Sequence, residues 1–245
     1  MTLSLILGFG GILLVASYVQ SVAGFAHGLI VMGSVTLLGL APVPFTAVVI
    51  SLTGLASILM ALKGRRTHID IPLFIRASLG LIPMLLVGLA LLHFLDKGAS
   101  LFLQRSLGLV ILSGGFLGMV KPRPRKQRSP HWHDLIAGGL AGILGGLFST
   151  SGPPLIFHLY RQPDRVDVIR STLLTIFLLA SFARIILVLG EGSFDADMLY
   201  LSLVSLPLVA LGTFLGRRFP PPLSERGMRR LAFGLLMVLG APLLI

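Results

Sequence analysis

Three hydroxyl residues in a row interrupt an apolar stretch near the middle of this 245-residue chain. Ser149, Thr150 and Ser151 are followed by Gly152 and two prolines, within the run FSTSGPP. Such a run cannot continue a helix, although its prolines suit the first turn of a helix that starts there. Hydroxyls and the free N–H groups of a helix start are neutral donors that suit a small oxyanion. The alternative is that the hydroxyls only cap a helix end.

A second group of polar and small residues lies near the N-terminus. The run AGFAHG at 23–28 contains Gly24 and His27, and Gln20 precedes it. His27 could donate a hydrogen bond to an anion or pass a proton, because histidine changes charge near neutral pH. Gln20 could complete a polar lining. The alternatives are a structural histidine bonded to a nearby carbonyl and a glutamine that holds helices together.

One cation lies inside an apolar run, Arg184 in LLASFARIILVLG. It is about six residues from the expected outer end of its helix, which is roughly 9 Å along the axis. An arginine at this depth is costly unless it faces a cavity or extends toward the membrane surface. Arg184 is therefore a candidate for the fixed charge that attracts an anion, with extension to the surface as the alternative.

The composition is that of a membrane protein in which most of the chain lies in spans. The chain is 55% hydrophobic and 12% charged, with a mean hydropathy of +0.95, whereas a soluble domain has about 25% charged residues. The net charge of +11 is confined to short blocks between apolar runs, which favours cytoplasmic loops over a nucleic-acid partner. The chain has no cysteine, so disulfides and thiolate metal sites are excluded, and we expect neither a cofactor nor a metal.

The apolar runs and loop charges predict a topology. A span needs about 20 residues. The runs that meet this length are 44–62, 71–95, 101–120, 168–190 and 197–216.

Basic blocks at 63–66, 121–128 and 217–218 should be cytoplasmic, and the acidic segment 191–197 should face out. The shorter runs 134–148 and 153–160 then form a hairpin that enters the membrane and returns, with FSTSGPP at its tip. Both termini are expected outside.

The two halves of the chain resemble each other at a nearly fixed offset. Asp70 and Asp195 are 125 residues apart, Gly88 and Gly212 are 124 apart, and Leu29 precedes Leu155 by 126. This offset aligns the break at 23–28 with the break at 149–154. Each half is thus predicted to be a broken helical hairpin plus three transmembrane helices, and since three is odd the second half is inverted. We expect an all-α polytopic membrane protein of two inverted-topology repeats, 1–120 and 134–245, joined by a basic cytoplasmic linker at 121–133.

The repeat, the small-residue run GGLAGILGGLF at 138–148 and the polar break after it resemble the sulfite exporter TauE/SafE family of membrane permeases. The resemblance covers most of the chain. Each half of a family member commonly carries GxGGG followed by apolar residues and a proline, whereas this chain has AGFAHG and STSGPP at these places. The resemblance implies an exporter of sulfite or an organosulfonate in a bacterial cytoplasmic membrane.

Inverted repeats with matching helix breaks predict a secondary transporter with a substrate site near the midplane. The leading hypothesis is alternating access around a small anion, bound by the following residues: Gln20, Gly24, His27, Ser149, Thr150, Ser151, Gly152 and Arg184. Proton coupling, coupling to the membrane potential and a homodimer stay open. The rival hypotheses are an intramembrane serine hydrolase, with His27 or His158 as the base, and a membrane scaffold without transport.

Overall fold

The computed structural model describes residues 3–62, 69–96, 98–119, 125, 127–222 and 225–244. In these ranges the chain is helical and contains no strand. The helices are α1 (Leu3–Ala23), α2 (His27–Leu37), α3 (Val43–Leu62), α4 (Ile71–Asp96), α5 (Ser100–Met119), α6 (His131–Phe148), α7 (Gly152–Leu159), α8 (Val166–Gly190), α9 (Ala196–Arg218), α10 (Glu225–Gly240) and the short η2 (Pro242–Leu244).

Five helices of the described part are long and apolar enough to cross a membrane: α1, α3, α4, α8 and α9. Four of them match runs predicted to span. α5 lies on the fifth predicted run, 101–120, and its described side chains form an apolar helix over Leu101–Phe116. The basic blocks at 63–66 and 121–124 lie outside the described residues, as do the side chains of Arg229 and Arg230.

Both predicted helix breaks are confirmed. α1 ends at Ala23 and α2 begins at His27, while α6 ends at Phe148 and α7 begins at Gly152. Among the described residues, Ala26 (φ 86°) and Ser149 (φ 54°) are the non-glycine residues with a left-handed backbone, and one lies in each break. A left-handed backbone costs a residue with a Cβ roughly 1–2 kcal/mol, so the surrounding packing must hold these two turns.

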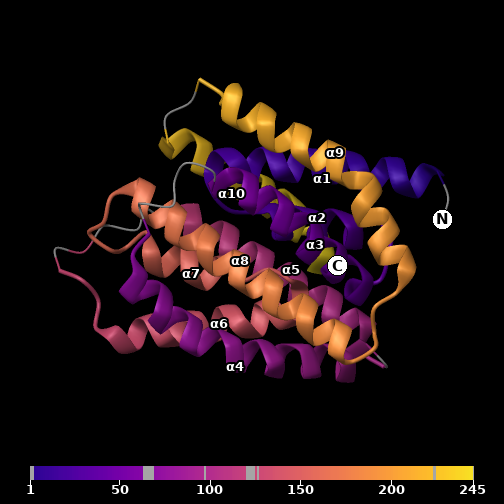
Figure 1. The fold of residues 1–245 in the computed structure, drawn as a ribbon, viewed down its shortest axis with the longest axis horizontal. Helices are drawn as coiled ribbons and strands as arrows, with labels where there is room; N and C mark the ends of the chain where they lie inside the picture. The colour runs from indigo at the N-terminus through magenta and orange to yellow at the C-terminus, as the bar shows by residue number, and fades with distance from the viewer. Residues whose placement is uncertain are drawn as a thin grey trace.

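The most extensive helix contacts join the two halves of the chain. α4 packs along α6, and α1 packs along α9; Figure 1 shows α9 with α1 on one side of the molecule and α4 with α6 on the other. Glycines permit this approach, since a Cβ on Gly138 would overlap the carbonyl oxygen of Ala77, and one on Gly212 would overlap that of Leu14. The small-residue run at 138–148 is therefore a packing surface within the chain.

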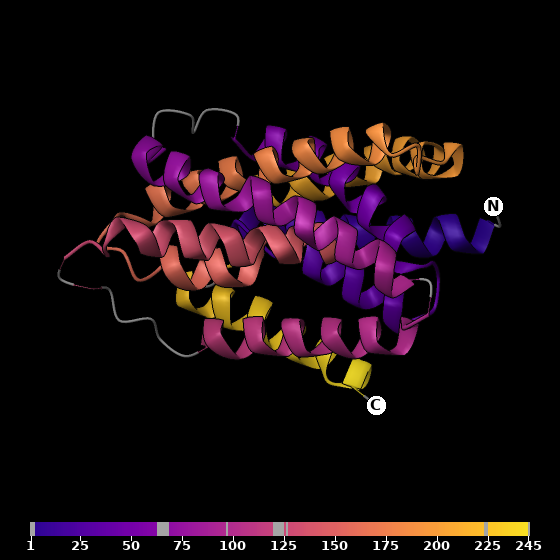
Figure 2. The same cartoon turned by 90° about the horizontal axis from the view of Figure 1, so that it is seen from below.

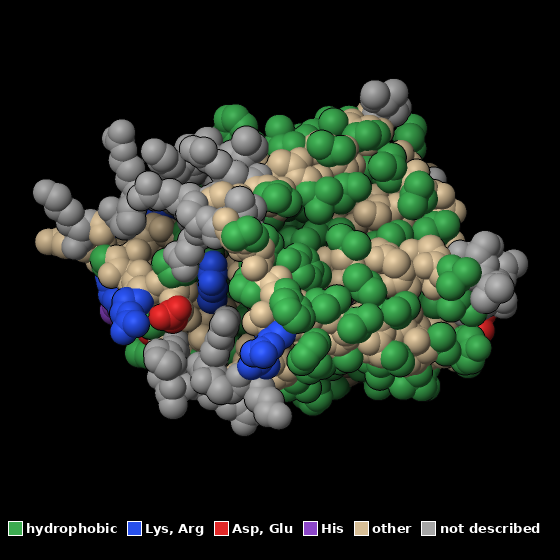
Figure 3. Space-filling view, turned by 90° about the horizontal axis from the view of Figure 1, so that it is seen from above, with side chains coloured by type: hydrophobic (Ala, Val, Ile, Leu, Met, Phe, Trp, Pro, Cys, Tyr) green, Lys and Arg blue, Asp and Glu red, His purple; other side chains and the backbone are tan. Residues whose placement is uncertain are grey.

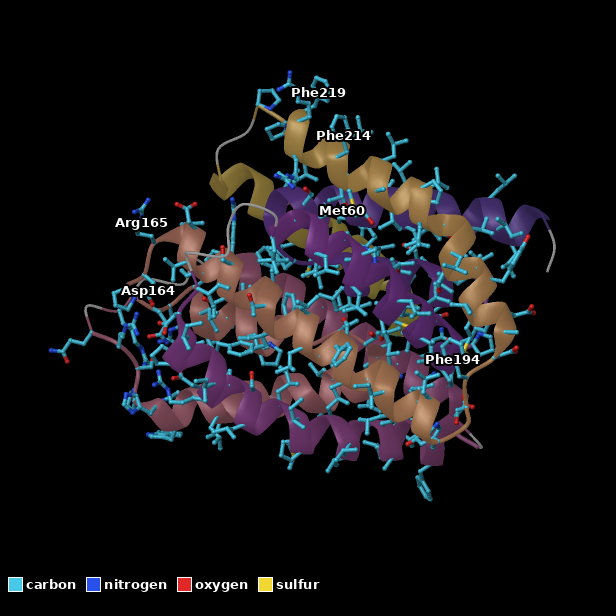
Figure 4. The ribbon with its side chains drawn as sticks, in the orientation of Figure 1. Met60, Asp164, Arg165, Phe194, Phe214 and Phe219 are labelled. Carbon is cyan, nitrogen blue, oxygen red and sulfur yellow. The ribbon has the colours of Figure 1, made fainter. Side chains whose placement is uncertain are left out.

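The remaining helices complete one elongated bundle. α10 packs against α5, as Figure 2 shows at its lower edge, and α3 packs against α8 and α9. Hydrophobic side chains cover the wall of the bundle in Figure 3, and charged side chains gather at one end. Figure 4 shows Asp164 and Arg165 at that end and Phe194 at the other. This distribution is that of a protein whose wall faces lipid and whose ends face water.

Candidate functional site

A small cavity of about 50 Å³ lies where the two helix breaks meet. The breaks touch directly, since a Cβ on Gly28 would lie 2.7 Å from the carbonyl oxygen of Ser149. Seven of the eight residues predicted to bind substrate line the cavity: Gln20, His27, Ser149, Thr150, Ser151, Gly152 and Arg184. Segments about 125 residues apart in the sequence thus line one cavity, whose wall combines these polar residues with apolar side chains. A water molecule needs about 10–15 Å³ measured in this way, so the cavity has room for a small ion.

Gly24 is the predicted residue that does not line the cavity. Its backbone is left-handed (φ 84°), and its N–H donates to the carbonyl of Gln20 at 2.7 Å. A Cβ at this position would lie 3.1 Å from the side chain of Arg170. Gly24 therefore shapes the turn that ends α1 and makes close contact with α8 instead of facing the cavity.

Arg184 brings a buried positive charge to the cavity. Its side chain is 2% exposed, so it does not extend to the surface. One terminal nitrogen, Nη1, donates to the carbonyl oxygens of Gly145 and Gly146 in the last turn of α6; the carbonyl of Gly145 also accepts from the N–H of Ser149 at 3.0 Å. No carboxylate of the described chain forms an ion pair with Arg184. The guanidinium is therefore held by neutral carbonyls, with no acid of the described residues within ion-pairing distance.

Three buried polar atoms on the cavity wall have no hydrogen-bond partner among the described residues. They are Oε1 of Gln20, Oγ1 of Thr150 and Nε of Arg184. Buried polar groups are nearly always paired, and leaving one unpaired costs roughly 1–3 kcal/mol. Thr150 and Arg184 can donate, and the Gln20 amide can present either its oxygen or its NH₂, since the two are exchanged by a rotation. Such unpaired groups around one space indicate a polar ligand.

The hydroxyl of Ser149 is already engaged within the protein. Ser51 of α3 donates to the carbonyl of Ala47 at 2.8 Å, and its oxygen lies 2.8 Å from Oγ of Ser149. Since the single proton of Ser51 is used, Ser149 donates to Ser51. Ser149 thus fixes the break between α6 and α7 to α3, and Thr150 and Ser151 are left to face a ligand.

Both ring nitrogens of His27 also have partners. Thr53 donates to the carbonyl of Val49 at 2.6 Å, so its oxygen accepts from Nε2 of His27 at 3.3 Å. Nδ1 then accepts from the hydroxyl of Ser17 at 3.4 Å. In a neutral imidazole, this network places the proton on Nε2. His27 joins α1 to α3 through its ring and meets the cavity at the start of α2.

The walls that α3 and α8 give to the cavity were not predicted from the sequence. Ile50, Gly54 and Ile58 contribute from α3, and Phe177, Ala180 and Ser181 contribute from α8 next to Arg184. In each helix these residues recur at intervals of three or four, which places them on one face. The helical period counted back from Arg184 would have found the residues of α8. No comparable polar residue marks the face of α3.

A separate ionic cluster ties α4, α6 and α7 together at the charged end of the bundle. Asp134 is 2% exposed and accepts from His158 at 2.6 Å and from Arg76 at 2.6 Å. Nearby, Arg128 pairs with Asp70 at 2.8 Å and with Asp164 at 2.7 Å. The hydrogen bond to Asp164 raises the pKa of Arg128 further above its ordinary value, and the Asp70 carboxylate adds to this despite partial burial.

Neither Ser149 nor Ser151 is hydrogen-bonded to a histidine ring in the part of the chain that the structure describes. His158 is bonded to Asp134 and to Gln162, and the nitrogens of His27 lie beside Ser17 and Thr53. A serine hydrolase would need one of these rings within about 2.6–3.2 Å of a serine hydroxyl. In this conformation the break supplies donors to a ligand and no activated nucleophile.

Comparisons with known proteins agree with this geometry. The model of the family described as "Sulfite exporter TauE/SafE" matches residues 9–243. A protein of Cupriavidus necator named "Probable sulfite/organosulfonate exporter TauE" is 42% identical over 240 residues, covering 98% of this chain and 94% of that protein. A protein of Comamonas testosteroni named "Probable inner membrane transporter protein TsaS" is 34% identical over 148 residues, covering 58% of this chain and 61% of that protein. No solved structure matches the chain.

Proposed function

Because this chain belongs to the sulfite exporter TauE/SafE family, we propose that it is a secondary transporter that exports a small anion of the sulfite or organosulfonate class. The name of the Cupriavidus necator relative supports this substrate class, and the name of the Comamonas testosteroni relative supports an inner-membrane location. The protein acts as a carrier and not as an enzyme.

The observation that carries the proposal is the buried charge of Arg184, which forms no ion pair in the described chain and lies beside unpaired donors. A buried cation without a carboxylate partner is costly, and an anion in the cavity supplies the missing charge. Nε of Arg184 and Oγ1 of Thr150, both without partners, then donate to its oxygens. A sulfite or sulfonate group offers three oxygens to such donors, and charge-assisted hydrogen bonds are roughly twice as strong as neutral ones.

The other site residues support this contact in different ways. Ser151 and the Gln20 amide complete the polar wall, and Gly152 at the start of α7 adds a backbone N–H at the positive end of a helix. His27 and Ser149 hold the two breaks against α3 through their hydrogen bonds. Gly24 is proposed to keep the first break in its left-handed turn, outside the anion's contact shell.

Inverted repeats explain how the site reaches both sides of the membrane. In the proposed arrangement, an operation that superposes 1–120 on 134–245 would exchange the α1–α9 contact with the α6–α4 contact, and residues 121–133 would be the linker. An offset of 126 also pairs Gly54 with Ala180 and Ile58 with Arg184, all of which line the cavity. Rocking of one repeat against the other then exposes the anion to each side in turn.

The orientation follows from the positions of charge. The charged end of the bundle, with Asp164 and Arg165, is cytoplasmic, and the opposite end, with Phe194, faces out. α1 starts at that opposite end (Figures 1 and 2), which supports an outside N-terminus, and the even number of crossings of the two repeats returns the C-terminus to the same side.

Export of an anion can draw on the membrane potential, which supplies about 2.3 kcal/mol per charge per 100 mV. No acidic residue lines the cavity, so the described residues offer no carboxylate proton relay there. We therefore propose that potential drives the cycle, with a proton passed through His27 as the second candidate. A homodimer is compatible with both.

Flux into proteoliposomes of the purified protein tests the function. Sulfite, sulfate, sulfoacetate, taurine and acetate are offered in turn, with an imposed potential or pH gradient. The proposal expects saturable flux of sulfite or sulfoacetate that increases with a potential that draws anions in. Absence of saturable flux for every anion would support the scaffold hypothesis, and release of a cleavage product would support the hydrolase.

A further inference from the structure

A second hollow, distinct from the central cavity, lies on the outside of the bundle. This groove, of about 320 Å³, runs between α5, α6 and α7. Most of its wall is apolar, from the residues Ile136, Ala137, Leu140, Leu144, Pro153, Pro154 and Phe157. Ile136 and Leu140 are 47% and 51% exposed, so the groove opens toward the lipid side of the bundle.

Cationic side chains stand at one end of this groove. Arg125, Arg161 and His133 contribute to its wall. The Arg125 N–H donates to the carbonyl of Arg161 at 2.9 Å, its guanidinium donates to Ser129 at 2.8 Å, and the guanidinium of Arg161 lies 5.1 Å from the ring centre of Phe157. These contacts hold both arginines beside the groove.

Neither arginine has a carboxylate partner in the described chain, whereas neighbouring arginines do. Arg76 pairs with Asp134, and Arg128 pairs with Asp70 and Asp164. The acidic groups of this end are thus used elsewhere, and the entrance of the groove keeps a positive charge that an anionic headgroup would balance.

The position of the groove matches the outer part of one lipid leaflet. Trp132, 58% exposed, stacks on His133 with ring centres 3.8 Å apart, and tryptophan is enriched at the membrane interface. From Ile136 to Leu144 the helix rises about 12 Å. The apolar wall therefore continues from headgroup level into the hydrocarbon, in the direction of an acyl chain.

We propose that the groove binds an anionic glycerophospholipid, with its phosphate on Arg125 and Arg161 and one acyl chain along α6. The chain would contact Pro153 and Pro154, the first turn of α7 directly after the polar break. The bound lipid therefore packs against the first turn of α7, next to the break between α6 and α7. This site is separate from the one that binds the transported anion.

Lipid binding to the full-length protein in neutral detergent tests this proposal by native mass spectrometry. The probes are phosphatidylglycerol and phosphatidylcholine with identical acyl chains. Phosphatidylglycerol is expected to bind about tenfold more tightly. Arg161→Gln should weaken its binding about fivefold, while Arg165→Gln, which alters a 79% exposed side chain paired with Asp167, should leave it unchanged. Equal affinity for the two lipids would overturn the proposal.

A second pair of variants tests the apolar wall without changing charge. Leu140→Trp fills the groove from an exposed position and should weaken binding of both lipids at least fivefold. Leu135→Trp makes the same change on α6 at a 48% exposed position that does not line the groove, and should bind as the wild type does. Unchanged phosphatidylglycerol affinity in Leu140→Trp, or an equal loss in Leu135→Trp, would contradict the assignment.

Discussion

Asp134 and Arg184 are each 2% exposed, but they differ in the partners of their charged groups. Asp134 is held between His158 and Arg76 by two hydrogen bonds of 2.6 Å. In the described part of the chain, Arg184 donates hydrogen bonds to the neutral carbonyls of Gly145 and Gly146, and its Nε has no partner. The charges of the ionic cluster are thus paired with one another, whereas the charge at the cavity forms no ion pair in the described residues.

This difference separates structural from functional charge. Removal of one member of a complete buried cluster leaves the others unpaired and destabilises the fold. Removal of a buried charge that has no ion-pair partner instead removes an unfavourable desolvation energy from the folded state. We therefore expect substitutions in the cluster to change stability, and substitutions in the cavity to change anion affinity and flux.

The largest expected effect is on stability, from Asp134→Asn. The substitution leaves Arg76 without its carboxylate and should lower the free energy of unfolding by about 3–5 kcal/mol. Thermal denaturation in detergent measures it. The matched control is Asp167→Asn, because Asp167 is 61% exposed and only 3.4 Å from Arg165; it should cost no more than about 1 kcal/mol. Equal effects of the two variants would refute the distinction.

The next largest effect is on transport, from Arg184→Met. Loss of the charge that contacts the anion should lower flux per unit concentration about 100-fold, equivalent to about 2.7 kcal/mol, while the melting temperature changes by only a few degrees. Arg184→Lys keeps the charge but loses the planar donors, so its flux should be intermediate. Wild-type flux in Arg184→Met would remove the basis of the proposed function.

Much of this comparison could be predicted from the sequence. Gly, Ser and Pro stop helices, so the breaks at 23–28 and 149–154 were visible, and the repeat offset indicated that they meet. The conflict between Arg184 and its apolar surroundings likewise pointed to the cavity. The sequence did not indicate that Gly24 lies outside the cavity wall, because the left-handed turn that directs it toward Arg170 depends on the backbone conformation and on packing with α8.

The partners of the polar residues could not be predicted. Ser51 and Thr53 lie in an unremarkable apolar run, and only the approach of α3 to both breaks reveals that they bind Ser149 and His27. His158 was a candidate base in the sequence, whereas the fold places it on Asp134 of α6. Hydropathy indicates which segments form membrane helices. Which side chains pair between helices depends on how each helix is rotated about its own axis.

A smaller effect on transport is expected from Thr150→Val. The substitution keeps the shape of the side chain and removes a donor that has no partner in the protein. The apparent affinity for the anion should fall about tenfold, or about 1.4 kcal/mol, with stability unchanged or slightly increased. Concentration-dependent flux in proteoliposomes measures it. A fall in melting temperature without a change in affinity would mean that Thr150 caps a helix end.

The smallest effect is expected from Ser149→Ala, which compares two neighbouring hydroxyls of the break between α6 and α7. Ser149→Ala removes the hydrogen bond to Ser51 and should cost about 1 kcal/mol of stability, with an affinity change below threefold. Ser51→Ala should have the same effect, and the double variant should be less than additive, since both remove one interaction. An affinity loss in Ser149→Ala as large as in Thr150→Val would make Ser149 a direct ligand of the anion.

The charge of Arg184 is proposed to bind the transported anion. Calorimetric titration of the purified protein with sulfite tests this most directly. The account predicts saturable binding in the wild type and in Asp167→Asn, and binding weakened about 100-fold in Arg184→Met. Binding of equal strength in the wild type and in Arg184→Met would contradict it.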